Sequence, residues 1–139
     1  MDLTLDDEAR RYLALFEDVT GAPGRDCIHI DDRLVIVVAR GHIAEAIGRG
    51  GETVERFEDR VDVPVRLVEY ADDPADFVAN ALAPAAVYNV TMSENDGTVA
   101  YVEVADEDRG VAIGRDGRTI ETARMLAARH FDIDDVQLT

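Results

Sequence analysis

Two stretches of the sequence are near-copies of each other. Residues 46–55 read AIGRGGETVE and residues 112–121 read AIGRDGRTIE, so the second copy follows the first at a distance of 66 residues. In each copy a short apolar helical face precedes the G-x-x-G sequence, and a second helical face follows it. A repeat of this length in a chain of 139 residues indicates an internal duplication.

The first half of the chain predicts the element order helix, strand, strand, helix, helix, strand. The polar pair Asp31-Asp32 predicts a hairpin turn between the first two strands, and Pro64 places the last strand at a sheet edge. The predicted elements are a helix at 5–19, strands at 28–30 and 34–38, a helix at 43–47, a helix carrying Val54 and Phe57, and a strand with alternating Val61, Val63, Val65 and Leu67.

The second half predicts the same order. Asp73 suits an N-cap with Pro74 at the first helical position, and the Asn-Asp-Gly sequence at 95–97 predicts a hairpin turn. The predicted elements are a helix from 74 that ends before Pro84, strands at 87–92 and 98–104, a short helix at 106–113, a helix with Ile120, Ala123 and Leu126 facing inward, and a strand with Ile133, Val136 and Leu138.

Together the two halves predict an α+β fold, an α/β sandwich of two tandem domains at residues 1–70 and 71–139, each in the order α-β-β-α-α-β. The two strands that flank the helix pair are joined by a crossover, and such a connection makes them parallel. Each domain is therefore expected to contain a three-stranded mixed sheet.

The G-x-x-G loop has a chemistry that suits phosphate. Backbone N–H groups at the start of a helix lack partners within that helix, and the helix dipole adds positive potential there. Glycine has no Cβ that would hold a sugar-phosphate backbone away. Arg49 and Arg115 occupy the second loop position, and a guanidinium can donate two parallel hydrogen bonds to phosphate. A single loop would be interpreted as a pair of helix caps, but its recurrence in the same context favours phosphate binding.

The element order with Ile-Gly-x-x-Gly resembles the type II KH domain, whose loop clamps about four nucleotides of a single strand. Two such domains in tandem resemble the archaeal NusA-like family of transcription termination/antitermination factors. The stretches that carry this narrower resemblance are 46–51, 68–77, 80–85 and 112–118. The resemblance implies a non-enzymatic RNA-binding transcription factor. RNA polymerase or other transcription factors stay open as partners, because the polymerase-binding and S1 domains of bacterial NusA have no counterpart in the sequence.

The resemblance implies that single-stranded RNA binds at both loops. The candidate residues are Ile47, Gly48, Arg49, Gly50, Gly51, Ile113, Gly114, Arg115, Asp116, Gly117 and Arg118. Ile47 and Ile113 would line the bases, although a place in the core is an equal alternative. The family loop often has Lys second and Asn two residues after the motif, where this chain has Arg and then Thr53 or Thr119. Because Asp116 puts an anion in the phosphate path, the second loop is expected to be the weaker clamp.

The composition predicts adaptation to high salt. The chain has 30 acidic and 14 basic residues, a net charge of −16, and all its basic residues are arginine. At ordinary salt such a charge would repel phosphates, but at 1 M salt the Debye length is only about 3 Å. An acidic, lysine-free and Asp-rich surface is typical of a protein that works in very high intracellular salt, so net charge does not decide the partner here.

Other site chemistries find little support. Cys27 is the only cysteine, which excludes an intrachain disulfide and a multi-cysteine zinc site. Cys27 and His29 would share a strand face as half a metal site, but no second pair is nearby. No apolar run approaches the roughly 18 residues of a membrane span, and the N-terminus lacks a secretory signal. We therefore expect a cytoplasmic monomer that needs no cofactor or metal.

Three alternatives to the transcription factor stay open. The first is a KH-type ribosome-assembly or RNA-processing factor. The second is a protein-interaction module whose G-x-x-G loops are vestigial. The third is a phosphate-binding enzyme, which would need a general base or metal ligand beside a loop, and Glu52 is the only nearby candidate.

Overall fold

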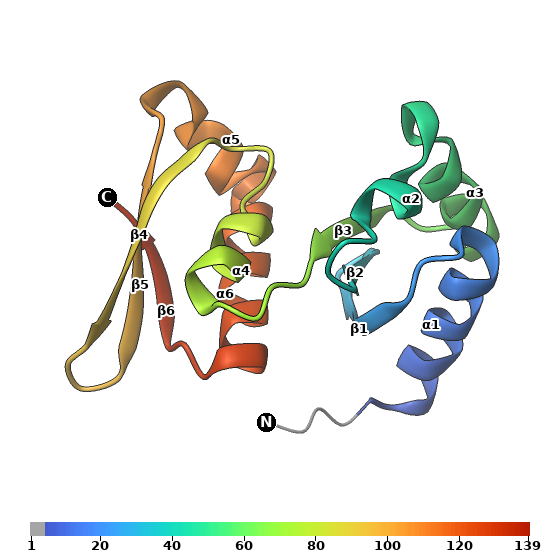
Figure 1. The fold of residues 1–139 in the computed structure, drawn as a ribbon, viewed down its shortest axis with the longest axis horizontal. Helices are drawn as coiled ribbons and strands as arrows, with labels where there is room; N and C mark the ends of the chain where they lie inside the picture. Colours follow the sequence, from blue (N-terminus) through green and yellow to red (C-terminus); the bar gives the residue numbers. More distant parts are fainter. Residues whose placement is uncertain (1–4) are drawn as a thin grey trace. The chain divides into compact units, whose positions relative to one another are not determined.

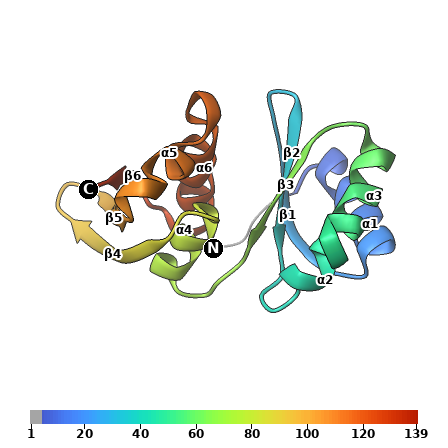
Figure 2. The same cartoon turned by 90° about the horizontal axis from the view of Figure 1, so that it is seen from above.

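The computed structural model describes residues 5–139. The described chain divides into two compact units, one ending at Tyr70 and the other beginning at Ala71 (Figure 1). In each unit the helices cover one face of a three-stranded sheet (Figure 2).

The first unit follows the predicted order. Its elements are α1 (Asp7–Thr20), β1 (Gly24–Ile30), β2 (Arg33–Val38), α2 (Ile43–Ile47), the 3-10 turn η1 (Arg49–Gly51), α3 (Glu52–Val61) and β3 (Val65–Glu69). The strand order is β1-β2-β3. β1 and β2 are antiparallel, whereas β2 and β3 are parallel.

Local sequence explains where α1 begins and ends, and its apolar face supplies the core. The side chain of Asp6 caps α1 by accepting a hydrogen bond of 2.7 Å from the amide of Ala9. Gly21 ends the helix in the left-handed conformation, with φ of 76°. Phe16 then packs edge-to-face on Phe57 of α3, with ring centroids 5.1 Å apart, and both rings are fully buried above Ile36 and its neighbours on β2.

The second unit repeats this arrangement. Its elements are α4 (Pro74–Ala81), β4 (Val87–Glu94), β5 (Thr98–Val104), the 3-10 turn η2 (Asp106–Asp108), α5 (Arg109–Ile113), the 3-10 turn η3 (Arg115–Gly117), α6 (Arg118–Phe131) and β6 (Asp135–Leu138). The strand order is β4-β5-β6, with β4 and β5 antiparallel and β5 and β6 parallel. Asp73 caps α4 as predicted, accepting from the amide of Asp76 at 3.2 Å, and Phe77, Leu126 and Val136 are fully buried.

The mixed sheets and the parallel strand pair are confirmed, but two predicted strand boundaries are wrong. Val61 belongs to α3, which ends there because Asp62 adopts the left-handed conformation with φ of 59°. The strand begins only at Val65, after Pro64, and it is an edge strand as predicted. Ile133 likewise is buried but precedes β6.

A further boundary differs at the first hairpin. β1 begins at Gly24, ahead of the predicted strand at 28–30, and its pairing with β2 contains an irregularity between Gly24 and Asp26. The short helix predicted at 106–113 is a 3-10 turn followed by α5. None of the helices in residues 5–139 has the length and apolar character that crossing a bilayer would need.

Candidate nucleic-acid interface

The first glycine of each loop packs closely against the helix that follows the loop. Gly48 has φ 75° and ψ 175°, and Gly114 has φ 81° and ψ 170°, a backbone region that is essentially restricted to glycine. A Cβ on Gly48 would lie 2.6 Å from the Cβ of Thr53 and 2.8 Å from its amide nitrogen, and a Cβ on Gly114 would lie 2.7 Å and 2.8 Å from the same atoms of Thr119. The first glycine is therefore required because the loop packs on the helix that follows it.

The last glycine of each loop faces open space. Gly51 and Gly117 are the N-cap residues of α3 and α6, with φ of 80° and 75°. A Cβ on Gly117 would meet nothing within 4 Å, and a Cβ on Gly51 would meet only an oxygen of Glu55, at 3.8 Å. No side chain caps either helix start, so this side of the loop is accessible to a ligand.

The tip residues have the same conformation in both loops despite their different identities. Gly50 has φ 62° and ψ 21°, and Asp116 has φ 55° and ψ 27°. Both are exposed. Asp is one of the few side chains that tolerate the left-handed region, which explains how the second loop keeps the backbone of the first.

Amides at the helix starts donate to carbonyls of the loops, which lie outside the helices α3 and α6. The amide of Gly51 donates to the carbonyl of Gly48 at 3.2 Å, and the amide of Glu52 donates to the carbonyl of Arg49. Equivalent bonds close the second loop, from Gly117 to Gly114 and from Arg118 to Arg115. These bonds make each loop a compact 3-10 turn.

The side chains that precede and follow the first glycine lie at the surface. Ile47 is 40% exposed and Ile113 is 41% exposed, while the alanines before them are fully buried. The core alternative for the two isoleucines is therefore excluded. Arg49 and Arg115 are exposed as well, and Arg118 is half-buried at the first position of α6. Each loop thus places an exposed cation and an exposed aliphatic side chain next to an open glycine.

Cys27 and His29, which the sequence offered as half a metal site, have structural surroundings. Cys27 is buried, and this burial, together with nearby Asp26 and Glu8, raises the pKa of its thiol to about 12. His29 lies outside the core with its Nδ1 3.3 Å from a carboxylate oxygen of Glu8. A protonated thiol is a poor metal ligand, and residues 5–139 contain no group of three or more side chains that could hold a metal ion. His42 is the N-cap residue of α2 and contacts Glu45.

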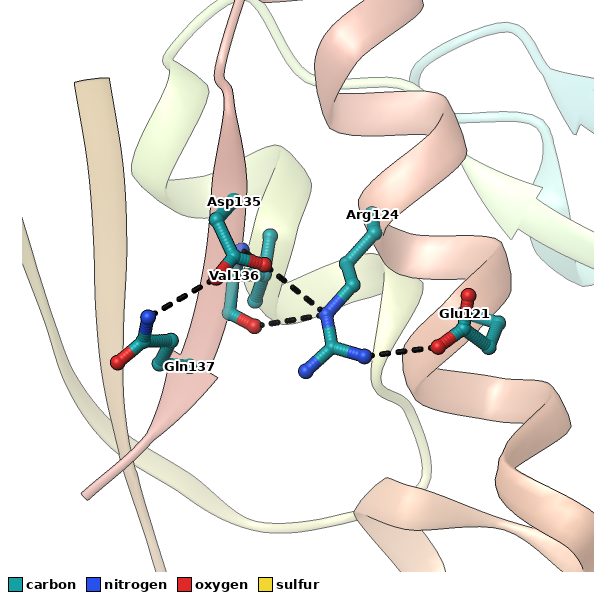
Figure 3. A network of polar contacts seen from close by, with 5 residues as sticks. All are labelled: Glu121, Arg124, Asp135, Val136 and Gln137. Atoms are coloured by element: carbon teal, nitrogen blue, oxygen red, sulfur yellow. Dashed lines mark hydrogen bonds and ion pairs between the residues drawn. The ribbon is translucent and has the colours of Figure 1, made fainter. Parts of the chain in front are cut away.

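Sequence reasoning missed a polar network between α6 and β6 (Figure 3). The Nε of Arg124 on α6 lies 3.1 Å from the carbonyl oxygen of Val136 and 3.1 Å from Oδ1 of Asp135 on β6. Another guanidinium nitrogen of Arg124 donates to Glu121 at 2.8 Å. Asp135 also accepts from the side chain of Gln137 at 2.9 Å. The neighbouring Asp134 lies outside this network and accepts from the amide of Thr98 at 2.7 Å.

The network stabilises the ionised form of Asp135. The hydrogen bond from Gln137 is the largest cause of a lowered pKa for this carboxyl group, and the amide of Val136 and the Arg124 guanidinium act in the same direction. No sequence motif predicts this network, because Arg124 and Asp135 come into contact only when β6 has folded back along α6.

Comparisons with known proteins agree with this architecture. Residues 74–139 match the NusA-like second KH domain family. The crystal structure of APE1850 superposes with a TM-score of 0.85 at 26% identity, covering 97% of this chain and 100% of that chain. The Mycobacterium tuberculosis protein named "Transcription termination/antitermination protein NusA" is matched only in part, with 39% identity over 69 residues, 50% of this chain and 20% of that protein.

Two archaeal proteins match over their full length. The "Probable transcription termination protein NusA" of Halococcus morrhuae is 62% identical over 138 residues, 99% of each chain. The protein of the same name from Halobacterium salinarum is 60% identical over 139 residues, 100% of each chain. Both sources are halophilic archaea, in agreement with the salt adaptation predicted from composition. The chain therefore belongs to the NusA-like family of archaeal transcription termination proteins.

Proposed function

We propose that this protein is an RNA-binding transcription factor that acts in termination or antitermination and binds single-stranded RNA through both G-x-x-G loops. The observation that carries the proposal is the shared loop geometry. Both loops have an open last glycine, an exposed arginine at the second position and an exposed isoleucine before the first glycine. We also propose that residues 1–70 form a KH domain like residues 71–139, because the element order and loop backbone are the same.

Each loop residue then has a distinct role. Gly51 and Gly117 allow a phosphate to approach the helix start, where the dipole favours negative charge. Arg49 and Arg115 add charged donors beside the same phosphates. Ile47 offers apolar surface to an unstacked base, as bases of single-stranded RNA pack on protein side chains. Backbone recognition of this kind fixes the strand without dictating its sequence.

The acidic surface is compatible with RNA binding in concentrated salt. At 1 M salt, charges beyond about 3 Å are screened, so the net charge of −16 acts weakly on the ligand. Counterion release also weakens binding as salt rises, with a slope near −0.7 per phosphate for single strands. Binding in molar salt must therefore depend on contact-range hydrogen bonds and apolar contacts at the loops.

The remaining parts of the proposal follow from the same role. A factor that acts on the transcript works in the cytoplasm, beside RNA polymerase or other transcription factors as further partners. We propose that it acts as a monomer and not as an enzyme. A KH-type ribosome-assembly or RNA-processing factor would use the same loops, whereas a protein-interaction module would not need them.

The proposal is tested by binding of a labelled single-stranded RNA of random sequence to the whole protein in 2 M KCl. We expect the double substitution Gly50→Asp and Gly51→Asp to weaken binding at least tenfold, about 1.4 kcal/mol. The fold should persist, because Asp116 already occupies the equivalent tip position. The matched control is the double substitution Gly21→Asp and Gly41→Asp, which adds the same two charges at two other exposed glycines of positive φ.

Two results would contradict the proposal. If the loop variant folds and binds RNA as tightly as the wild type, the loops are only helix caps and the protein-interaction module takes precedence. If the loop variant loses RNA binding but transcripts in a reconstituted transcription reaction terminate as before, the ribosome-assembly or RNA-processing role is favoured.

A further inference from the structure

The two loops differ in a carboxylate that lies one turn into the following helix. Glu55 and Glu121 occupy the same place in the two repeats. A Cβ on Gly51 would lie 3.8 Å from Oε1 of Glu55, whereas a Cβ on Gly117 would meet nothing within 4 Å. The Glu55 carboxylate therefore lies beside the open side of the first loop, and the Glu121 carboxylate lies away from the second.

The position of Glu121 has a visible cause (Figure 3). Arg124 lies three residues further along α6, and its guanidinium holds the Glu121 carboxylate at 2.8 Å. Residues three apart are neighbours on a helix surface, so this ion pair draws the carboxylate toward the C-terminal end of α6 and away from the loop.

Arg124 is itself fixed by β6. Its Nε lies 3.1 Å from the carbonyl of Val136 and 3.1 Å from the carboxylate of Asp135. Gln137 and the amide of Val136 hold that carboxylate in turn, at 2.9 Å and 2.8 Å. Because several groups hold the Arg124 guanidinium, its ion pair with Glu121 has one orientation. An isolated surface ion pair, by contrast, contributes little to stability.

The first unit differs at this position of the repeat. The position of Arg124 in the repeat is taken by Glu58, whose carboxylate accepts a hydrogen bond from the amide of Val65 at 2.9 Å. Glu58 and Glu55 carry like charges three residues apart, and such pairs repel. The repulsion favours the orientation of Glu55 toward Gly51.

We propose that Arg124 is a positioning residue that keeps the second loop open to RNA phosphate by holding Glu121 away, and that Glu55 competes with phosphate at the first loop. This inference rests on the proposed function. It makes the second loop the stronger clamp, the reverse of what Asp116 alone suggested.

The test measures affinity of the whole protein for a fluorescein-labelled 12-nucleotide RNA of random sequence in 2 M KCl, together with thermal melts. A charge at a helix N-terminus changes an equilibrium constant by about two- to fivefold at low ionic strength, and because salt screens this effect, the lower end of that range is expected in 2 M KCl. Arg124→Gln should weaken RNA binding by about that factor, because Glu121 is released. Adding Glu121→Gln to the same protein should restore wild-type affinity.

The melts separate positioning from stability. Arg124→Gln removes the bonds to Val136 and Asp135 with or without Glu121, so both variants should melt below the wild type while only the double variant recovers RNA binding. Glu55→Gln, in the other unit, should strengthen binding by about the same factor. Arg10→Gln breaks the exposed ion pair with Asp7 at 3.5 Å on α1 and is the matched control. It should leave the RNA affinity unchanged.

The outcomes are distinguishable. Absence of RNA binding by the wild type would overturn the proposed function and this inference with it. RNA binding by the wild type that is unaltered in Arg124→Gln, or that stays weak after Glu121→Gln is added, would overturn the positioning role alone. Unchanged affinity in Glu55→Gln would overturn the competition at the first loop.

Discussion

The two repeats have the same loop backbone but different charges around it. The tip is Gly50 in the first loop and Asp116 in the second, with φ of 62° and 55°. The first helical residue after the loop is Glu52 in one unit and Arg118 in the other. The two loops therefore share a geometry that only glycine and a few other residues can adopt, whereas the charges around the loops differ.

The units also differ in the helix behind the loop. α3 spans 10 residues and α6 spans 14, so the second helix is about one turn longer. β6 returns along the longer helix and carries Asp135 to Arg124, a contact that β3 does not reproduce, because Glu58 stands at the equivalent place. The comparison shows how one residue in the following helix, Glu58 or Arg124, can change the electrostatics beside a loop whose backbone is unchanged.

The largest expected effect is the loss of stability at low salt, which should differ between the two units. Residues 1–70 carry 16 acidic and 9 basic side chains, and residues 71–139 carry 14 and 5, giving charges of −7 and −9. Below a few tenths molar salt the Debye length exceeds about 5 Å, and self-repulsion then opposes the folded state. We expect both units to unfold more readily in 0.1 M than in 3 M KCl, and the second unit to lose more protection.

Thermal melts in 0.1 M and 3 M KCl test the overall effect, and amide hydrogen exchange followed by peptide mass spectrometry assigns it to each unit. A melting temperature that is equal or higher at low salt would contradict the halophilic adaptation. Equal loss of protection in both units would contradict the ranking by net charge.

The next effect compares the first and last glycines of one loop. Gly48→Ala places a Cβ 2.8 Å from the amide nitrogen of Thr53 in a backbone region restricted to glycine. We expect it to lower the free energy of unfolding by about 3 kcal/mol or more. A Cβ on Gly51 would meet only an oxygen of Glu55, at 3.8 Å, so Gly51→Ala should cost about 1 kcal/mol for its left-handed backbone.

Denaturant unfolding in 3 M KCl measures both values. The pair Gly114→Ala and Gly117→Ala serves as a replicate in the other unit, because the distances there are nearly the same. Equal costs at the first and last glycines would show that backbone conformation alone, and not packing on the threonine, fixes the loop.

The loops could be located from sequence because glycine and its neighbours recur at a constant spacing, and Asp73 and Pro74 fixed the start of α4 by local capping chemistry. The end of α3 could not be located in the same way. Val61 satisfies both the helical and the alternating pattern, and the helix stops at Asp62 instead of at a glycine. Local periodicity does not show whether a valine such as Val61 is the last residue of a helix or the first residue of a strand.

The network around Arg124 was beyond sequence reasoning for a different reason. Arg124 lies on an exposed helix face where an arginine needs no explanation, and its partner Asp135 is on a strand whose register is set by pairing with Val99. The exposure of Ile47 and Ile113 could not be predicted for the same reason, since an isoleucine after a buried alanine can lie either in the core or at the surface. Both questions depend on tertiary packing, which local patterns do not encode.

A smaller effect separates the charge of Asp116 from its conformation. Asp116→Asn keeps a side chain that tolerates the left-handed region but removes the anion from the loop tip. We expect RNA affinity to rise about two- to fivefold, the range for one charge near a helix start, with little change in melting temperature. Gly50→Asn in the first loop is the matched control, since it adds the same side chain without changing charge. An unchanged affinity in Asp116→Asn would place this carboxylate outside the phosphate path.

The smallest effect is the pH dependence contributed by Asp135. Its pKa is lowered in the folded protein, first by the hydrogen bond from Gln137 and then by the Val136 amide and Arg124. The stability it contributes is therefore present above the ordinary pKa of an aspartate and is lost as the pH falls through the lower folded-state value. Because the side chain is 37% exposed, solvent screening limits the contribution to about 0.5 kcal/mol.

Comparison of wild type with Asp135→Asn isolates this contribution from that of the other acidic residues, which titrate equally in both proteins. In 3 M KCl the difference in unfolding free energy between them should be constant from pH 7 to about 5 and should shrink between about pH 4 and 2, as the wild-type carboxylate takes up its proton. A difference that stays constant down to pH 2 would mean that the network holds Asp135 by shape and not by charge, and the ion pair with Arg124 would then be dispensable for the orientation of β6 against α6.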